Sequence, residues 1–169
     1  WSSRCCQHNV AFGWPYLAEH LWLATSDQGV AAVIYAPSSV ELKVGPRGQV
    51  VRLIEETSYP FSGKIVFTVV SAGEVAFPLY LRLPGWAQKA LISVNDEQPA
   101  EVKAPGKFAV LERRWKYGDQ ICLNLEESMQ FKFWPGIGQA ISIRRGPLWF
   151  SLEIKEIWEK YNGTESWPA

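Results

Sequence analysis

Two adjacent cysteines near the start of the chain offer the clearest chemistry in the sequence. Cys5 and Cys6 are followed by Gln7, His8 and Asn9, and an apolar run comes next. Thiols and an imidazole at such a junction indicate either a site for a soft metal ion or an activated thiolate. A cysteine close to a helix N-terminus has a lowered pKa, because the helix dipole and the free N–H groups stabilise the thiolate. Buried packing, a strained vicinal disulfide and a redox switch remain alternatives for the pair.

The composition excludes several classes of protein. Seventeen Lys and Arg residues balance seventeen Asp and Glu residues, so the sequence predicts no nucleic-acid partner and no anionic membrane surface. No apolar run reaches the length of a membrane span. Three cysteines cannot all pair internally, and Cys122 stands far along the chain in a strand-like stretch, which argues against a disulfide scaffold.

The 169 residues suffice for one domain with a real core. Because the chain starts at Trp1 rather than at a methionine, we expect it to be a piece of a longer protein. The compartment stays open between the cytoplasm and a periplasmic or secreted location in a bacterium.

A helix is expected to follow the cysteine pair. Apolar residues from Trp14 to Trp22 recur at helical spacing, which predicts a main helix over Pro15–Thr25 with one buried stripe. Asn9–Trp14 is then a turn or a short helical lead-in, because proline is tolerated only in the first turn. Gly29 suits a left-handed position after the helix.

The hydrophobic period changes from 3.6 to two residues after Gly29, and many short strands follow. They are predicted over Val30–Ala36, Val40–Val44, Val50–Ser58, Lys64–Ser71, Phe77–Leu83, Leu91–Val94, Phe108–Glu112, Gln120–Leu125, Met129–Phe133, Ala140–Arg144 and Leu148–Leu152. Short strands without intervening helices predict a mainly β fold, an antiparallel β-sandwich. Lys64–Ser71 is apolar on both faces, as expected of a central strand covered on each side.

This pattern divides the chain into three parts. Residues 1–28 form a terminal helical segment, residues 29–152 the β-sandwich, and residues 153–169 a C-terminal tail. Within the tail, Glu153–Tyr161 is compatible with a short helix, and Asn162-Gly163-Thr164 is a glycosylation sequon.

Several separated segments resemble one family in order. They are Cys5-Cys6-Gln7-His8-Asn9, Ser58-Tyr59-Pro60-Phe61-Ser62-Gly63-Lys64-Ile65, Leu81-Arg82-Leu83-Pro84-Gly85-Trp86, Trp115-Lys116-Tyr117-Gly118-Asp119 and Arg144-Arg145-Gly146-Pro147-Leu148. The chain resembles the β-L-arabinofuranosidase family of glycoside hydrolases, family 127, also catalogued as a family of unknown function, DUF1680. The resemblance covers roughly residues 4–152. It implies an (α/α)6 barrel that holds the active site, truncated here to its last helical segment, and a jelly-roll-like sandwich behind it.

The resemblance also implies roles for the cysteines. Cys5 would be the nucleophile of a retaining glycosidase, and Cys5 and Cys6 would both bind Zn²⁺ together with another Cys and a Glu. A further Glu would act as the acid/base. Those residues lie in the missing N-terminal barrel of the same protein, so the fragment alone is expected to be inactive. Gln7-His8 stands where active relatives often carry Pro-Pro, which makes His8 a candidate contact to the substrate or the metal.

The implied substrates are L-arabinofuranosides or related plant-type glycans. The chemistry is coherent, because a thiolate can replace the usual carboxylate nucleophile if metal coordination deprotonates it. The alternative is a non-catalytic carbohydrate-binding or structural β-sandwich module. In that case Trp86, Trp115 and Trp134 are candidates for stacking on sugars, although each is more typical of core or interdomain packing.

Overall fold

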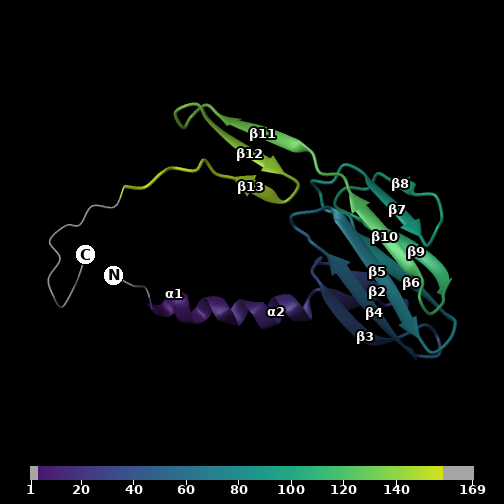
Figure 1. Ribbon diagram of the computed structural model, residues 1–169. Coiled ribbons are helices and arrows are strands. Elements are labelled where there is room, and N and C mark those ends of the chain that lie inside the picture. The colour runs from purple at the N-terminus through teal and green to yellow at the C-terminus, as the bar shows by residue number, and fades with distance from the viewer. Residues whose placement is uncertain (1–3, 158–169) are drawn as a thin grey trace.

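The computed structural model describes residues 4–157, which form a β-sandwich with two extensions on one side (Figure 1). The N-terminal extension consists of α1 (Arg4–Asn9), the 3-10 turn η1 (Val10–Phe12) and α2 (Gly13–Glu19). It projects away from the sandwich, and its end with α1 lies farthest from the sheets (Figure 1).

The helical segment starts and ends earlier than the periodicity predicts. The prediction of a helix over Pro15–Thr25 is wrong at its C-terminal end, because α2 stops at Glu19 and Trp22 begins a strand. Trp22 packs edge-on against Phe67, with ring centroids 5.7 Å apart, and its Nε1 donates to Ser38 Oγ at 3.1 Å. These tertiary contacts outweigh the local helical pattern. The predicted buried stripe is also wrong for Trp14, which is exposed in the described structure.

The sandwich consists of two sheets that pack face to face. The four-stranded sheet has the order β1-β2-β6-β9, and the six-stranded sheet has the order β3-β4-β5-β10-β7-β8. Their bounds are β1 (Trp22–Ala24), β2 (Val30–Ala32), β3 (Ser38–Val44), β4 (Gln49–Thr57), β5 (Lys64–Ser71), β6 (Val75–Arg82), β7 (Ala90–Val94), β8 (Ala100–Val102), β9 (Phe108–Trp115) and β10 (Gln120–Leu125). The mainly β sandwich predicted from the sequence is therefore confirmed.

Four details differ from the sequence-based expectations. Strands β1 and β8 were not predicted, and the pair β2–β6 is parallel whereas the other pairs are antiparallel. Strand β5 buries Ile65, Phe67 and Val69, but the residues between them are only half-buried, so its second face is not fully covered by described residues. Gln28, not Gly29, adopts the left-handed conformation, with a φ of 65°. Gly29 is required for another reason, because a Cβ there would lie 2.3 Å from the Pro78 carbonyl oxygen.

The core forms where the inward faces of the two sheets meet. Strand β6 alternates as predicted, since Leu79 and Leu81 are fully buried and Tyr80 is not. Trp115 is fully buried at the end of β9, and its Nε1 donates to the Phe77 carbonyl oxygen at 2.9 Å. Burying aromatic and aliphatic side chains of this size supplies most of the stabilisation of such a sandwich.

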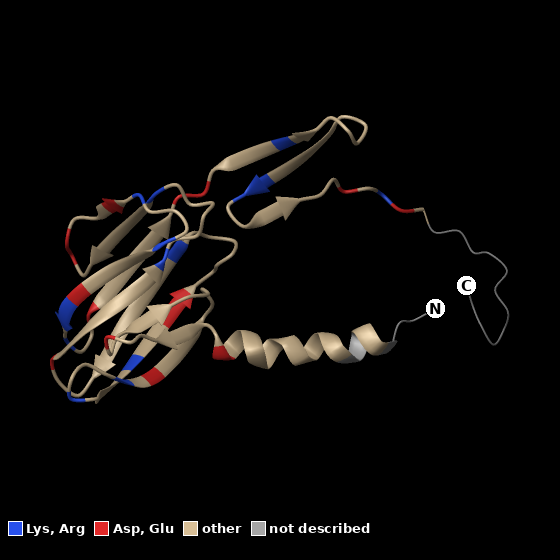
Figure 2. Ribbon diagram, turned by 180° about the vertical axis from the view of Figure 1, so that it is seen from behind, with Lys and Arg blue, Asp and Glu red and all other residues tan. Residues whose placement is uncertain are grey.

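A third sheet stands apart from the sandwich. It has the order β11-β12-β13 and comprises β11 (Met129–Trp134), β12 (Ala140–Arg145) and β13 (Leu148–Phe150). These strands lie within the range 29–152 predicted for the sandwich, yet in the described part of the chain they pair with one another and with no strand of the sandwich. The three-stranded sheet and the helical segment extend from the same side of the sandwich (Figures 1 and 2).

The C-terminal tail contributes no regular structure in its described part. Residues 151–157 form neither helix nor strand, so the first half of the predicted helix over Glu153–Tyr161 is absent there. The remainder of that helix and the sequon at Asn162 lie outside the described residues.

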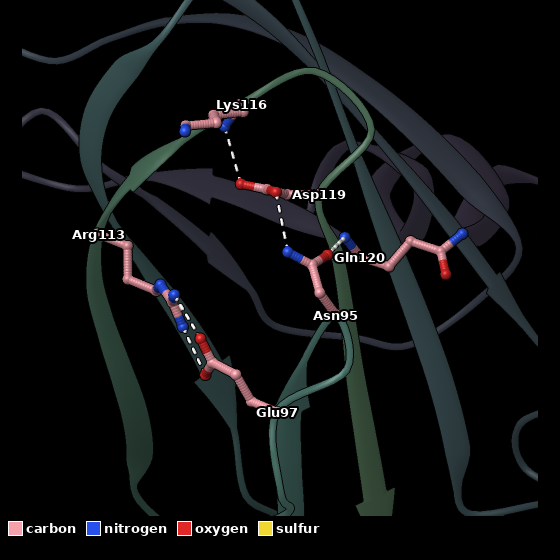
Figure 3. Close-up of polar contacts among 6 residues, drawn as sticks. All are labelled: Asn95, Glu97, Arg113, Lys116, Asp119 and Gln120. Carbon is pink, nitrogen blue, oxygen red and sulfur yellow. Dashed lines mark hydrogen bonds and ion pairs between the residues drawn. The ribbon is translucent and has the colours of Figure 1, made fainter.

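A polar cluster joins two turns at one end of the sandwich (Figure 3). Asp119 Oδ2 accepts from the Lys116 backbone N–H at 2.8 Å, and Asp119 Oδ1 accepts from Asn95 Nδ2 at 3.0 Å. Asn95 Oδ1 in turn accepts from the Gln120 backbone N–H at 2.8 Å. Partial burial acts to raise the pKa of Asp119, but the hydrogen bonds from Lys116 and Asn95 hold it below its usual value. The β9–β10 turn is therefore fixed by an ionised carboxylate.

Replacing Asp119 with alanine should lower the free energy of unfolding by roughly 1–2 kcal/mol, since two hydrogen bonds to a charged acceptor are lost. Urea denaturation of the wild type and the variant at neutral pH measures the difference. Asp96→Ala is the matched control, because Asp96 is an exposed carboxylate in the neighbouring turn. Equal destabilisation by both substitutions would contradict the role of Asp119.

Candidate functional site

Cys5 and Cys6 both lie on α1, and both side chains are exposed. Their Sγ atoms are 3.8 Å apart. This separation is far longer than a disulfide bond of about 2.05 Å. It is reached within a regular α-helix, so adjacent cysteines need no break in the helix to bring their sulfurs together.

The sulfur–sulfur distance fits a shared metal ion. Two thiolates bonded to one tetrahedral zinc at about 2.3 Å lie about 3.8 Å apart. Cys5 and Cys6 match that spacing and present soft sulfur donors that zinc prefers. In donor type and spacing, the pair therefore fits half of a tetrahedral zinc site.

The other half of such a site is not found in the described part of the chain. Among the side chains that the structure describes, no three His, Cys, Asp or Glu residues are grouped closely enough to hold a metal ion. Cys122 lies on β10, inside the six-stranded sheet, where its register partners are Val66 and Ser93. That position is remote from α1 (Figure 1). The side chain of His8 lies outside the described part of the structure, so its role in substrate or metal binding stays a prediction.

The segment that carries the cysteines presents an unusually apolar surface. Val10, Phe12, Trp14 and Tyr16 are each at least 65% exposed, and they occupy η1 and α2. Helices of soluble proteins normally bury one such stripe. An exposed apolar area of this kind is typical of a surface that is covered by another part of a protein.

Two of the remaining motifs have structural roles, one in the sandwich and one in the three-stranded sheet. In the segment Trp115–Asp119, the indole fills the core, Gly118 adopts a φ of 85°, and Asp119 fixes the turn. In the segment Arg144–Leu148, a Cβ at Gly146 would lie 3.3 Å from the Trp86 ring and 3.4 Å from Glu127. The motifs thus fix turns and close packing.

The structure separates the three tryptophans that are candidates for stacking on sugars. Trp115 is fully buried, and Trp86 is half-buried against the core, so both serve packing. Trp134 differs, because it lies on β11 outside the sandwich and is 37% exposed. Only Trp134 retains the accessibility that stacking on a sugar requires.

A buried carboxylic acid escaped the sequence analysis. Glu55 on β4 is only 2% exposed; its Oε1 accepts from the Ala36 backbone N–H at 3.0 Å, and its Oε2 has no hydrogen-bond partner among the described residues. Burial raises the pKa of Glu55 to about 8, against the opposing effects of the Ala36 N–H and the Ser38 hydroxyl. The sequence does contain a sign of this burial. Side chains alternate along a strand, so Glu55 lies on the same core face as Val51 and Leu53.

A comparison of the sequence with models of protein families shows which family the chain belongs to. Residues 29–127 match the family model described as β-L-arabinofuranosidase, GH127 middle domain. The chain belongs to the GH127 β-L-arabinofuranosidase family. The match begins just before β2 and ends just before β11, so it covers both sheets of the sandwich except β1.

Solved structures agree with this GH127 assignment. A GH127 β-L-arabinofuranosidase from Geobacillus stearothermophilus T6 is 26% identical, with a TM-score of 0.74, and covers 88% of this chain. A protein described as a glycoside hydrolase has 26% identity, a TM-score of 0.72 and 88% coverage. A GH127 β-arabinofuranosidase at 24% identity, with a TM-score of 0.71 and 88% coverage, shows the same fold.

The chain spans only part of these proteins. It accounts for 24%, 25% and 26% of their respective lengths. No significant match is found among curated proteins. Within residues 4–157, no helix combines the length and the apolar character needed to cross a bilayer.

Proposed function

We propose that this chain is the C-terminal part of a retaining glycoside hydrolase that acts on L-arabinofuranosides or related plant-type glycans. The observation that carries the proposal is a pair of adjacent thiols, 3.8 Å apart, in a chain of the GH127 family. The printed activity of the Geobacillus relative, a β-L-arabinofuranosidase, supports the substrate class.

The chemistry assigns a separate task to each cysteine. Cys5 would attack the anomeric carbon through Sγ, while the glycosidic oxygen leaves with a proton from an acid in the rest of the protein. Water would then attack the anomeric carbon and give a proton to the same group, now acting as a base, while the carbon–sulfur bond breaks and the Cys5 thiolate is restored. Cys5 and Cys6 would hold a zinc ion, which when bound keeps a thiol deprotonated at neutral pH. Cys6 would thereby fix the position of the Cys5 sulfur.

The exposed apolar surface of η1 and α2 offers a contact for the rest of the protein. We infer that the exposed apolar side chains of η1 and α2 lie against helices of an (α/α)6 barrel in the full-length protein. Val10, Phe12 and Trp14 would be removed from water in that arrangement. The barrel would also supply the acid/base Glu and the remaining metal ligands.

The full-length protein is expected to hydrolyse an aryl β-L-arabinofuranoside and to contain about one zinc per chain. The isolated 169-residue chain should do neither at a measurable level, because the proposed acid and the remaining metal ligands would belong to the barrel, and the described side chains contain no group of three metal-binding residues. Release of the aryl alcohol and metal analysis by mass spectrometry measure both properties.

Two outcomes would contradict the proposal. Hydrolysis by the isolated chain would show that the missing barrel is not required. A full-length protein that binds arabinofuranosides but does not cleave them would favour the non-catalytic binding module instead.

A further inference from the structure

The three-stranded sheet has two chemically different faces. Side chains alternate across a strand, and the register pairs Gln130 with Arg144 and Lys132 with Ser142. One face is mainly apolar and includes Met129, Phe131, Phe133, Ile141, Ile143, Leu148 and Phe150, with Arg145 at its end. The opposite face combines polar and aromatic groups and consists of Gln130, Lys132, Trp134, Ser142, Arg144 and Trp149. We call it the polar-aromatic face.

The residues of the polar-aromatic face hold one another in place. Lys132 Nζ lies 3.7 Å from the centroid of the Trp134 ring, and the Trp134 Nε1 donates to Ser142 Oγ at 2.9 Å. Arg144 Cζ lies 5.6 Å from the centroid of the Trp149 ring. Cation–π contacts of this kind orient a charged side chain without neutralising it.

Besides its contact with Trp149, the Arg144 side chain is held by hydrogen bonds to Gln130. Its Nε donates to the Gln130 Oε1 at 2.8 Å, and its Nη2 contacts the same oxygen. The guanidinium has five donor hydrogens, so part of its hydrogen-bonding capacity remains for a ligand. A planar guanidinium fixed in this way suits bidentate binding of a carboxylate.

The charge on this face is not balanced by acidic side chains. The ion pairs in the described part of the chain involve neither Lys132 nor Arg144. Figure 2 shows basic positions on β11 and β12 and no acidic position on the three-stranded sheet. Lys132 is exposed and Arg144 is half-buried beside aromatic rings, so the two cations create a positive potential there.

Five residues of this face, Gln130, Lys132, Ser142, Arg144 and Trp149, line a pocket of about 330 Å³, to which Phe131 of the same strand also contributes. This volume lies at the lower end of the range for small-molecule sites, about 300–1,000 Å³. It is suited to one sugar residue rather than a long oligosaccharide. The Trp149 side chain is 58% exposed, so part of its surface is available to the C–H groups of a sugar ring.

We propose that the polar-aromatic face binds a uronate residue, with the sugar carboxylate on Lys132 and Arg144 and the sugar ring against Trp149. The basic residues would provide selection against neutral sugars, and Gln130 and Ser142 would be available to ring hydroxyl groups. This binding site is separate from Cys5 and does not depend on the proposed hydrolase activity.

The experiment titrates the ¹⁵N-labelled 169-residue chain with sodium D-galacturonate and follows the indole N–H resonances. The Trp134 and Trp149 resonances, assigned from Trp→Phe variants, should shift with a dissociation constant on the order of 1 mM. Galactose should bind at least about tenfold more weakly, because it lacks the carboxylate. Inorganic phosphate at equal ionic strength should not displace the uronate at a similar concentration.

Variants test the two cations separately. Arg144→Gln and Lys132→Met should each weaken galacturonate binding about tenfold or more. Lys43→Met is the matched control, because Lys43 is exposed on β3 and forms no ion pair in the described structure. An equal loss of binding in Lys43→Met would overturn the proposal.

The wild-type protein provides an independent test if a variant fails to fold. Raising the salt concentration from about 50 mM to about 500 mM should weaken galacturonate binding several-fold, because exposed charges are screened. Absence of indole shifts, equal binding of galactose, or insensitivity to salt would each overturn the proposal. Equal displacement by phosphate would reduce the site to a general anion site and would also overturn it.

Discussion

Replacing Cys5 with serine in the full-length protein is expected to lower kcat for an aryl β-L-arabinofuranoside by roughly four orders of magnitude or more. A serine hydroxyl is far less acidic than a thiol, so it does not supply an ionised nucleophile at neutral pH. It also replaces a soft sulfur donor with a hard oxygen donor, and zinc content should fall with activity. Initial rates and metal analysis of the same preparation measure both effects.

Cys122→Ser is the matched control for this experiment. Cys122 is a half-buried thiol on β10 and lies remote from α1 (Figure 1). Its replacement should change kcat by no more than about twofold, because no reacting group is altered. Full activity together with full zinc content in the Cys5→Ser protein would refute the thiolate mechanism.

Replacing Glu55 with glutamine should remove a pH dependence from the stability of the sandwich. The pKa of Glu55 is raised by burial to about 8 in the folded state, from 4.5 as the ordinary value. Between these values the folded chain retains a proton that the unfolded chain releases. The free energy of unfolding of the wild type should therefore fall by about 1.4 kcal/mol per pH unit as the pH rises, and level off above about 8.

The Glu55→Gln chain should lack this slope and be more stable than the wild type at pH 8 to 9 by several kcal/mol. The amide oxygen can still accept from the Ala36 N–H. Urea denaturation at a series of pH values measures the slopes. Glu56→Gln, on the exposed face of the same strand, should leave the slope unchanged. Parallel pH profiles for the wild type and Glu55→Gln would contradict the prediction.

The strands were predictable because their chemistry is local. Leu79 and Leu81 alternate with Tyr80, and the inward face of a sheet requires that period. The start of β1 was not predictable in this way, because Trp22 continues the helical spacing of Leu17 and Ala18 as well as it starts a strand. Its contact with Phe67, 45 positions further along the chain, decides the conformation.

The candidate site was predictable only in part. The Cys5–Cys6 pair was evident from residue type, but the family resemblance, rather than spacing, suggested its role. The burial of Glu55 depends on how two sheets stack, and the isolation of Lys132 and Arg144 from carboxylates depends on a separate sheet. Such arrangements come from tertiary packing, which local periodicity does not specify.

The position of β10 between β5 and β7 has a consequence for synthesis of the chain. Until Leu125 has emerged from the ribosome, the six-stranded sheet exists only as two unconnected pieces, β3-β4-β5 and β7-β8. Each piece has an inner edge with unpaired N–H and C=O groups, and such edges favour intermolecular association. The nascent sandwich is thus vulnerable until its last strand is inserted. A truncation that removes β10 leaves both edges permanently open.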